Sequence, residues 1–256
     1  MGAEKTKNVT SDASGWPDFV RAEQYDKAVN RAFYRAAAAR LLESAPALSG
    51  RGLDLGCGTG FSLESLSAAI PDVVWIGVDR SREMLTRARS KTGLRAASLC
   101  EARAEALPFA NGSFEVVVAN FSWHWFGKEA GHEVRRVLRP GGFFLACLPL
   151  RRFSGAPGNR ALAHALLAGR GHFARRASQG FRFDDVPNVL PGEVRLLRHE
   201  LVVVNERFAG GRELLDVLRS RGALAAIFGE EPPTAIEVPS PVDFEWSFAV
   251  LHAQIS

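Results

Sequence analysis

The stretch GLDLGCGTG at residues 52–60 constrains the fold of this 256-residue chain more than any other. A short apolar strand pattern with one acid inside it, Asp54, runs into three closely spaced glycines, Gly56, Gly58 and Gly60. A helical pattern of apolar residues begins directly after them. Glycine permits a turn with positive φ and lets a ligand approach bare backbone. The stretch therefore predicts a strand, a glycine turn and a helix, the first half of a nucleotide-binding βαβ unit.

The glycine spacing separates two kinds of nucleotide site. A dinucleotide site has its third glycine three residues after the second, whereas Gly60 follows Gly58 by two, which disfavours an NAD enzyme. A second acid, Asp79, lies at the end of the next predicted strand. A carboxylate there can accept hydrogen bonds from both ribose hydroxyls, and Ser81 is better placed to cap the following helix. The alternative is a tight turn in a doubly wound domain without a ligand.

Strand and helix patterns alternate along most of the chain. Strands are predicted at 52–55, 73–78, 95–100, 114–121, 143–148, 194–204 and 244–253. Helices are predicted at 19–43 (one or two helices), 60–69, 82–91, 128–138, 159–167 and 211–220. This alternation indicates an α/β protein with a parallel sheet that is covered on both faces.

Composition excludes several classes of protein. Hydrophobic residues make up 46% and charged residues 23% of the chain, as in an ordinary globular protein. No apolar run reaches the roughly 20 residues of a membrane span. The net charge is +4, with acids interleaved among the arginines, which disfavours nucleic acid as a partner. Three widely spaced cysteines are typical of reduced thiols, so we expect a cytoplasmic protein. From the lack of a long apolar run we expect no membrane partner.

Several motifs, taken in order, resemble the class I S-adenosylmethionine (SAM)-dependent methyltransferases of the type 11 family. They are LDLGCGTG at 53–60, GVDRSREML at 77–85, AEALPF at 104–109, the strand at 114–121 and VLRPGG at 137–142. The resemblance covers residues 19–150 well and the rest loosely. Within the group, the chain is most similar to malonyl-carrier-protein methyltransferases of biotin synthesis and to trans-aconitate methyltransferases.

The resemblance implies a fold and a domain organisation. The fold class would be α/β, with a Rossmann-like seven-stranded mixed sheet, mostly parallel, whose last strand is antiparallel, and with helices on both faces. A disordered tail at 1–15 would precede a single domain at 16–256. Within that domain, an N-terminal helical cover at 18–45 and a small substrate lid at 151–192 are expected.

The resemblance also implies SAM as the cofactor and S-adenosylhomocysteine (SAH) as its product. The implied cofactor-binding residues are Tyr25, Asp54, Gly56, Gly58, Gly60, Asp79, Arg80, Ala104, Glu105 and Asn120. The glycines would lie against the methionine part of SAM, Asp54 would orient the loop or the ammonium group, and Asp79 would hold the ribose. Asn120 would close over the methionine end. Tyr25 would cover the cofactor from the N-terminal helix.

One position departs from the family pattern. Many relatives carry an aspartate just before the AEALPF segment, where it contacts the adenine amino group, but this chain has Arg103. Arginine cannot accept that hydrogen bond. Either Glu105, Glu101 or a backbone carbonyl must accept the hydrogen bond from adenine in place of the aspartate, or adenine is bound more weakly.

The stretch SWHWF at 122–126 follows the strand at whose end methyl donor and acceptor should meet in this fold. His124 is the candidate catalytic residue, as a general base for a hydroxyl acceptor or as a group that orients a carboxylate. Trp123 and Trp125 are the candidate substrate residues and would form an apolar wall with Phe126. In the alternative interpretation, the aromatic residues belong to the core and His124 is structural.

The function that follows is methyl transfer from SAM to an oxygen, carboxylate or hydroxyl, of a small-molecule acceptor. One alternative is a carrier-protein-bound acyl O-methyltransferase of the biotin-synthesis type, which would have a carrier protein as partner. Another is a SAM-binding protein that does not methylate, either a cyclase or a regulatory protein. We expect a monomer or a homodimer, and the histidines show no metal-ligand spacing.

Overall fold

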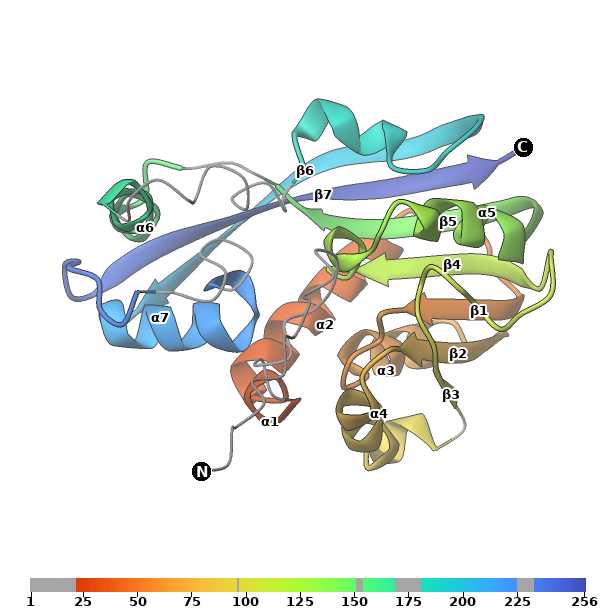
Figure 1. Ribbon diagram of the computed structural model, residues 1–256, viewed down its shortest axis with the longest axis horizontal. Helices are drawn as coiled ribbons and strands as arrows, with labels where there is room; N and C mark the ends of the chain where they lie inside the picture. The colour runs from red at the N-terminus through yellow and green to blue at the C-terminus, as the bar shows by residue number, and fades with distance from the viewer. Residues whose placement is uncertain (1–21, 96, 151–153, 169–180, 225–232) are drawn as a thin grey trace, which may run out of the picture.

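A seven-stranded sheet in the order β3-β2-β1-β4-β5-β7-β6 forms the centre of the molecule (Figure 1). The computed structural model describes residues 22–95, 97–150, 154–168, 181–224 and 233–256. The strands are β1 (Gly50–Leu55), β2 (Val73–Asp79), β3 (Ser98–Glu101), β4 (Phe114–Asn120), β5 (Leu138–Pro149), β6 (Val194–Phe208) and β7 (Val242–Ile255).

The strand directions agree with the predicted fold class. β1, β2, β3, β4 and β5 pair in parallel. β7 is antiparallel to both of its neighbours, β5 and β6, so β6 runs in the same direction as the first five strands. The predicted mixed sheet, mostly parallel with an antiparallel last strand, is confirmed.

Helices cover both faces of this sheet. The α-helices are α1 (Ala22–Tyr25), α2 (Ala28–Leu42), α3 (Phe61–Ala69), α4 (Arg82–Arg89), α5 (Glu129–Val137), α6 (Pro157–Ala168) and α7 (Gly211–Ser220), and three short 3-10 helices are η1 (Thr92–Leu94), η2 (Trp123–Trp125) and η4 (Phe183–Asn188). Leu41 of α2 and Leu66 of α3 share one apolar core with Val116 and Val118 of β4. Val134 of α5 lies in a second core, with Leu53 and other residues of the opposite face.

Two predicted strand boundaries shift for local reasons. The strand predicted at 95–100 begins only at Ser98; Arg95, in a helical conformation, caps the end of η1 instead of starting the strand. The strand predicted at 143–148 begins at Leu138, which pairs with Phe114 before a register shift. Gly141, with φ 76°, lies inside that shift, so the residues expected to form a turn are an irregular part of β5.

Not every predicted segment lies within the described residues. The tail predicted at 1–15 lies outside them, and so do parts of the lid predicted at 151–192 and of the cover predicted at 18–45. The described part of the lid contains α6 and η4, and the described part of the cover contains α1 and α2. In Figure 1 the long strands β6 and β7 extend beyond the parallel strands toward α6 and α7.

The topology brings the predicted site residues to one edge of the sheet. Parallel strands β1, β2 and β4 lie side by side, so their carboxyl ends, and the loops that follow, meet at that edge. The glycine loop follows β1, Asp79 ends β2, and Asn120 ends β4.

Candidate functional site

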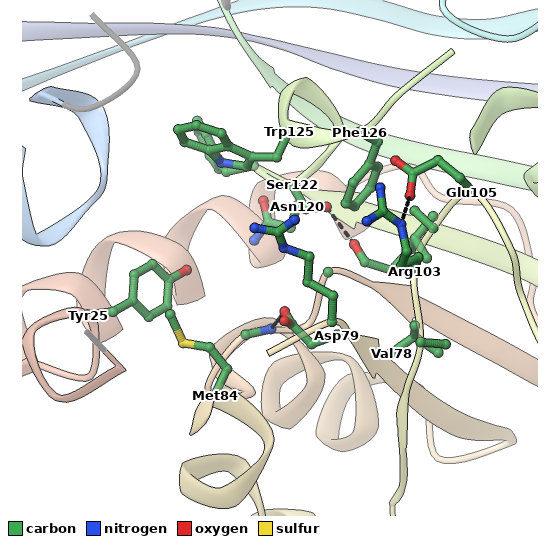
Figure 2. Close-up of a pocket in the computed structure, with 17 residues that line it drawn as sticks. Tyr25, Val78, Asp79, Met84, Arg103, Glu105, Asn120, Ser122, Trp125 and Phe126 are labelled. Carbon is green, nitrogen blue, oxygen red and sulfur yellow. Dashed lines mark hydrogen bonds and ion pairs between the residues drawn. The ribbon is translucent and has the colours of Figure 1, made fainter. Parts of the chain in front are cut away.

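A cleft opens where the carboxyl ends of β1, β2 and β4 meet (Figure 2). It encloses about 710 Å³, including its open mouth. Its lining residues are Tyr25, Leu55, Gly56, Gly58, Val78, Asp79, Arg80, Met84, Ala102, Arg103, Ala104, Glu105, Asn120, Phe121, Ser122, Trp125 and Phe126. The cleft thus brings together most of the predicted cofactor residues, together with Trp125.

The three glycines of the loop have different surroundings. Gly56 and Gly58 line the cleft with φ of 73° and 53°. A Cβ on Gly56 would lie 2.5 Å from Cβ of Ser122, whereas one on Gly58 would only touch the ring of Tyr25 at 3.5 Å. Gly60, with φ 86°, does not line the cleft, and a Cβ there would lie 2.3 Å from Cδ1 of Leu94. Gly60 therefore allows α3 to begin close to η1.

Asp79 holds the loop in place with both of its carboxylate oxygens. Oδ2 accepts a hydrogen bond from the Gly58 N–H at 2.8 Å, and Oδ1 accepts one from the Ser81 N–H at 2.8 Å. The Ser81 hydroxyl in turn accepts from the Met84 N–H, so Ser81 caps α4 as predicted. Burial raises the pKa of Asp79, and the hydrogen bonds oppose that shift. Since an ionised carboxylate oxygen can accept more than one hydrogen bond, Asp79 retains capacity for a ligand.

Asp54 lies beneath the cleft, outside its lining. The residue is 1% exposed, and among the described residues Oδ2 has no hydrogen-bond partner. Burial, and secondarily the charge of Asp79, raises the pKa of Asp54 to about 7. A buried carboxylate oxygen without a partner is costly, and such a group is a candidate partner for a cationic ligand.

Tyr25 covers the loop from the end of α1. Its ring stacks on Phe61 with centroids 5.8 Å apart and lies 5.1 Å from the ring of Tyr34. The structure therefore places the Tyr25 side chain in the cleft lining next to Gly58.

The segment after β3 forms the opposite wall. Ala104 and Glu105 both line the cleft, and the Glu105 Oε1 accepts a hydrogen bond from the Gly127 N–H at 2.7 Å. Arg103 Nε lies 3.4 Å from Glu105 Oε2, a pairing that Figure 2 shows at this wall. Glu101, the other acid considered as a replacement, pairs with Arg82 and lies outside the lining.

Asn120 and Phe121 end β4 at the cleft. The Asn120 amide nitrogen donates to Ser62 Oγ at 2.7 Å and to the Tyr34 carbonyl at 3.2 Å. The Asn120 Oδ1 is buried and has no hydrogen-bond partner among the described residues. Phe121 has φ 56°, a left-handed conformation that is rare for an aromatic residue and typical of functional sites.

The stretch at 122–126 divides between cleft and core. Trp125 and Phe126 line the cleft. Trp123 is buried in the core below, with its ring 4.9 Å from that of Phe144. His124 is half-buried and outside the lining; its Nδ1 has no hydrogen-bond partner within the described part of the chain. Burial lowers the pKa of His124 to about 3, so its imidazole is neutral at physiological pH.

Sequence reasoning missed several apolar lining residues. Val78 and Met84 flank Asp79 on β2 and α4, and Ala102 follows β3. Met84 could have been predicted from its position in the first turn of α4, three residues after the N-cap Ser81. Within the described ranges, no group of histidine, cysteine, aspartate and glutamate could hold a metal ion, and no helix is long and apolar enough to span a membrane.

Comparison with known proteins identifies a domain within the chain. Residues 53–142 match a family described as "Methyltransferase domain". The malonyl-[acyl-carrier protein] O-methyltransferase of Alcanivorax borkumensis is 36% identical over 134 residues, which is 50% of this chain and 45% of that protein. The chain spans less than half the length of the curated relatives that it matches.

Solved structures share the fold at low sequence identity. The YcgJ protein of Bacillus subtilis has a TM-score of 0.56 and 18% identity, covering 87% of this chain and 98% of that one. The [4+2]-cyclase SpnF has a TM-score of 0.57 and 18% identity, covering 94% of this chain and 86% of that one. Residues 53–142 therefore match a methyltransferase domain, and the chain shares the class I fold of these solved structures.

Proposed function

We propose that this chain is an enzyme that transfers a methyl group from SAM to an oxygen of a small-molecule acceptor and releases SAH. The observation that carries the proposal is the buried Oδ2 of Asp54 without a described partner, below a loop whose Gly56 and Gly58 present bare backbone to an open cleft. A cationic amino-acid group would satisfy that carboxylate. When bound, SAM supplies a methyl group activated by the positive charge on sulfur.

The residues present fit the methionine and ribose parts of this cofactor, and the adenine end differs from the family pattern at Arg103. Asp54 Oδ2 and Asn120 Oδ1, which have no hydrogen-bond partner among the described residues, offer acceptors for an ammonium group. Asp79 offers acceptors for ribose hydroxyls, and Tyr25 lies over the loop. At the adenine end, Glu105 accepts from the Gly127 N–H and pairs with Arg103, but its carboxylate oxygens can accept further hydrogen bonds, so Glu105 and the backbone around Ala104 are the candidate replacements for the family's aspartate.

The contribution of the protein to methyl transfer would be positioning. An in-line displacement at the methyl carbon needs donor and acceptor held in line at contact distance, and this can lower the barrier substantially without proton transfer. Phe121, Trp125 and Phe126 supply aromatic surface on the side of the cleft after β4. Aromatic faces exclude water and stabilise a nearby cation.

His124 stays the candidate base for a hydroxyl acceptor, and Trp125 stays the candidate acceptor contact, whereas Trp123 packs in the core outside the lining. For His124 the support is weak, because a base whose conjugate acid has a pKa of about 3 accepts a proton poorly at neutral pH. A carboxylate acceptor, which needs no base, suits the site better.

Two other functions have specific support. The name of the Alcanivorax relative supports an acyl group on a carrier protein as the acceptor. Similarity to SpnF supports a cyclase that binds SAM without methylating, although that similarity reaches only the fold. A cytoplasmic location and a monomeric or homodimeric state stay predictions from the sequence.

The proposal is tested by incubating the full chain with methyl-labelled SAM, a panel of small carboxylic acids and phenols, and malonyl carrier protein. Label should move to one small acceptor with SAH formed in equal amount. Label on the carrier protein alone would favour the carrier-linked function. Tight SAM binding without any SAH, from every acceptor offered, would favour the cyclase.

A further inference from the structure

One nearly buried cation lies just outside the cleft and has no part in the function proposed above. The Lys91 ammonium donates to Asp26 Oδ1 at 2.7 Å, to the Thr59 carbonyl at 2.5 Å and to Thr59 Oγ1 at 3.3 Å. It also lies 3.9 Å from the centroid of the Phe61 ring. The side chains of Lys91 and Asp26 are only 9% and 15% exposed.

The two residues that accept hydrogen bonds from Lys91, Asp26 and Thr59, adjoin the cover and the floor of the cleft. Asp26 directly follows Tyr25, which covers the loop, and Thr59 directly follows Gly58, which forms its floor. Thr59 is itself fully buried. Phe61, under the ammonium, is the ring on which Tyr25 stacks. A single ammonium group thus connects the cover to the floor at the point where the two approach each other.

Other contacts also hold the cover near Tyr25: the Asn30 amide nitrogen donates to the Tyr25 carbonyl at 2.8 Å. Glu23 and Arg87 form a long ion pair of 3.9 Å between more exposed side chains, and such pairs stabilise little. Burial lowers the pKa of Lys91, and the hydrogen bond and charge of Asp26 oppose that shift. Since charges with little exposure interact more strongly than exposed ones, Lys91–Asp26 is the stronger of the two ion pairs.

We propose that Lys91 is a positioning residue for the cofactor, which acts by fixing Tyr25 over the backbone of Gly58. The inference rests on the proposed function, because the molecule enclosed between Tyr25 and Gly58 is SAM. The tie is made by protein groups alone, so it can arrange the cover without help from the cofactor, and affinity gains from this preorganisation.

The first measurement is the dissociation constant of SAH, by calorimetry on the full chain. Lys91→Met keeps the length and apolar stem of the side chain but removes the charge. It should weaken SAH binding roughly tenfold. Lys91→Arg, which restores a cation, should recover most of the loss. Arg82→Met is the matched control, because it removes an exposed ion pair with Glu101 from the same region and should leave affinity unchanged.

The second measurement separates positioning from general stability. In a Tyr25→Ala background, Lys91→Met should cost much less affinity than in the wild type, because its effect passes through Tyr25. Equal losses in both backgrounds would overturn the inference, as would a Lys91→Met variant that binds SAH within twofold of the wild type.

A third measurement does not depend on SAM. Amide hydrogen exchange of residues 22–30 in the ligand-free protein should become faster in Lys91→Met and stay unchanged in Arg82→Met. Unchanged hydrogen exchange of residues 22–30 in Lys91→Met would show that Lys91 does not fix the cover. A wild-type chain that fails to bind SAH while the exchange result holds would instead refute the proposed function, so the two failures are distinguishable.

Discussion

At the scale of single residues, Asp54 and Asp79 follow the same pattern in sequence but have different surroundings. Both are acids at the carboxyl ends of neighbouring strands. Asp79 is stabilised by two backbone N–H donors, from Gly58 and Ser81. Asp54 Oδ2 has no such donor among the described residues. The sequence alone identifies both acids but does not distinguish the satisfied one from the one that a ligand would satisfy.

Asp54→Asn should stabilise the ligand-free protein at pH 8. The pKa of Asp54 is raised to about 7, above the unfolded value, so the folded state holds its proton more tightly and stability falls as pH rises from about 4 to 7. A shift of about three units corresponds to an upper limit of ~4 kcal/mol. Denaturant unfolding should show a gain of ~2 kcal/mol or more at pH 8 and little gain at pH 4. A loss of stability at pH 8 would contradict the assignment.

Gly58→Ala and Gly60→Ala should separate binding from folding. A methyl group on Gly58 meets only the edge of Tyr25, so its stability cost is the left-handed strain of about 1–2 kcal/mol. It would, however, occupy space between the loop and its cover and weaken SAH binding. A methyl group on Gly60 meets Leu94 at 2.3 Å, which adds about 1–3 kcal/mol of overpacking to the strain. Thermal unfolding and SAH titration of both variants check this, and equal melting temperatures would count against it.

His124→Ala should change the single-turnover rate of methyl transfer by less than about threefold. Removal of a working general base would cost about 10²–10⁴ in rate. The buried Nδ1 of His124 and its pKa of about 3 argue against that role, as does its place outside the lining. A fall of a hundredfold, with SAH affinity preserved, would restore His124 as the base and point to a hydroxyl acceptor.

At the scale of elements, the wall of the cleft formed by the segment after β3 is held by α5. Glu133 Oε2 accepts from the Leu107 N–H at 2.7 Å, and Arg136 donates to the Leu107 and Phe109 carbonyls at 3.0 and 2.6 Å. Glu133 and Arg136 also pair with each other at 2.7 Å. The segment AEALPF has no regular hydrogen-bonding partner strand, so these side chains take that place.

Arg136→Met should loosen this wall without touching the cleft. Two backbone carbonyls and the Glu133 carboxylate lose their partner, which should cost about 1–3 kcal/mol of stability. Hydrogen exchange of residues 104–111 should become faster, and SAH affinity should fall a few-fold. Arg139→Met, which breaks an exposed pair with Glu115 just beyond the C-terminal end of α5, is the control. Equal hydrogen-exchange rates at residues 104–111 in both variants would contradict this role of Arg136.

The sequence predicted these elements to different degrees. Buried strands such as β2 and β4 were predicted within about two residues at each end, because a continuous apolar run bounded by turns has few alternatives. The start of β5 was missed, because Leu138 pairs with Phe114 across an irregularity that has no local signature. The short helix η2 was not predicted either. Which of Trp123 and Trp125 faces the cleft depends on tertiary packing, which the sequence pattern does not give.

At the scale of the whole molecule, a side-chain network connects the C-terminal strands β6 and β7 to helix α2. Arg221 pairs with both oxygens of Glu206 on β6 at 2.6 and 3.0 Å, and Trp246 of β7 donates to the same carboxylate. Arg221 also lies over the ring of Phe33 in α2, 4.1 Å from its centroid. This network fixes α2, and with it the cover, against the part of the chain that the family resemblance describes only loosely.

The most direct test of the central claim is a calorimetric titration of the full chain with SAH at pH 6 and pH 8. The account predicts one saturable site with affinity roughly tenfold tighter at pH 8, because Asp54, with a pKa of about 7, must lose its proton to face the ammonium group. Binding at pH 6 should therefore release a proton, and Asp54→Asn should abolish both effects. No binding at pH 8, or binding that is independent of pH between 6 and 8, would contradict the account.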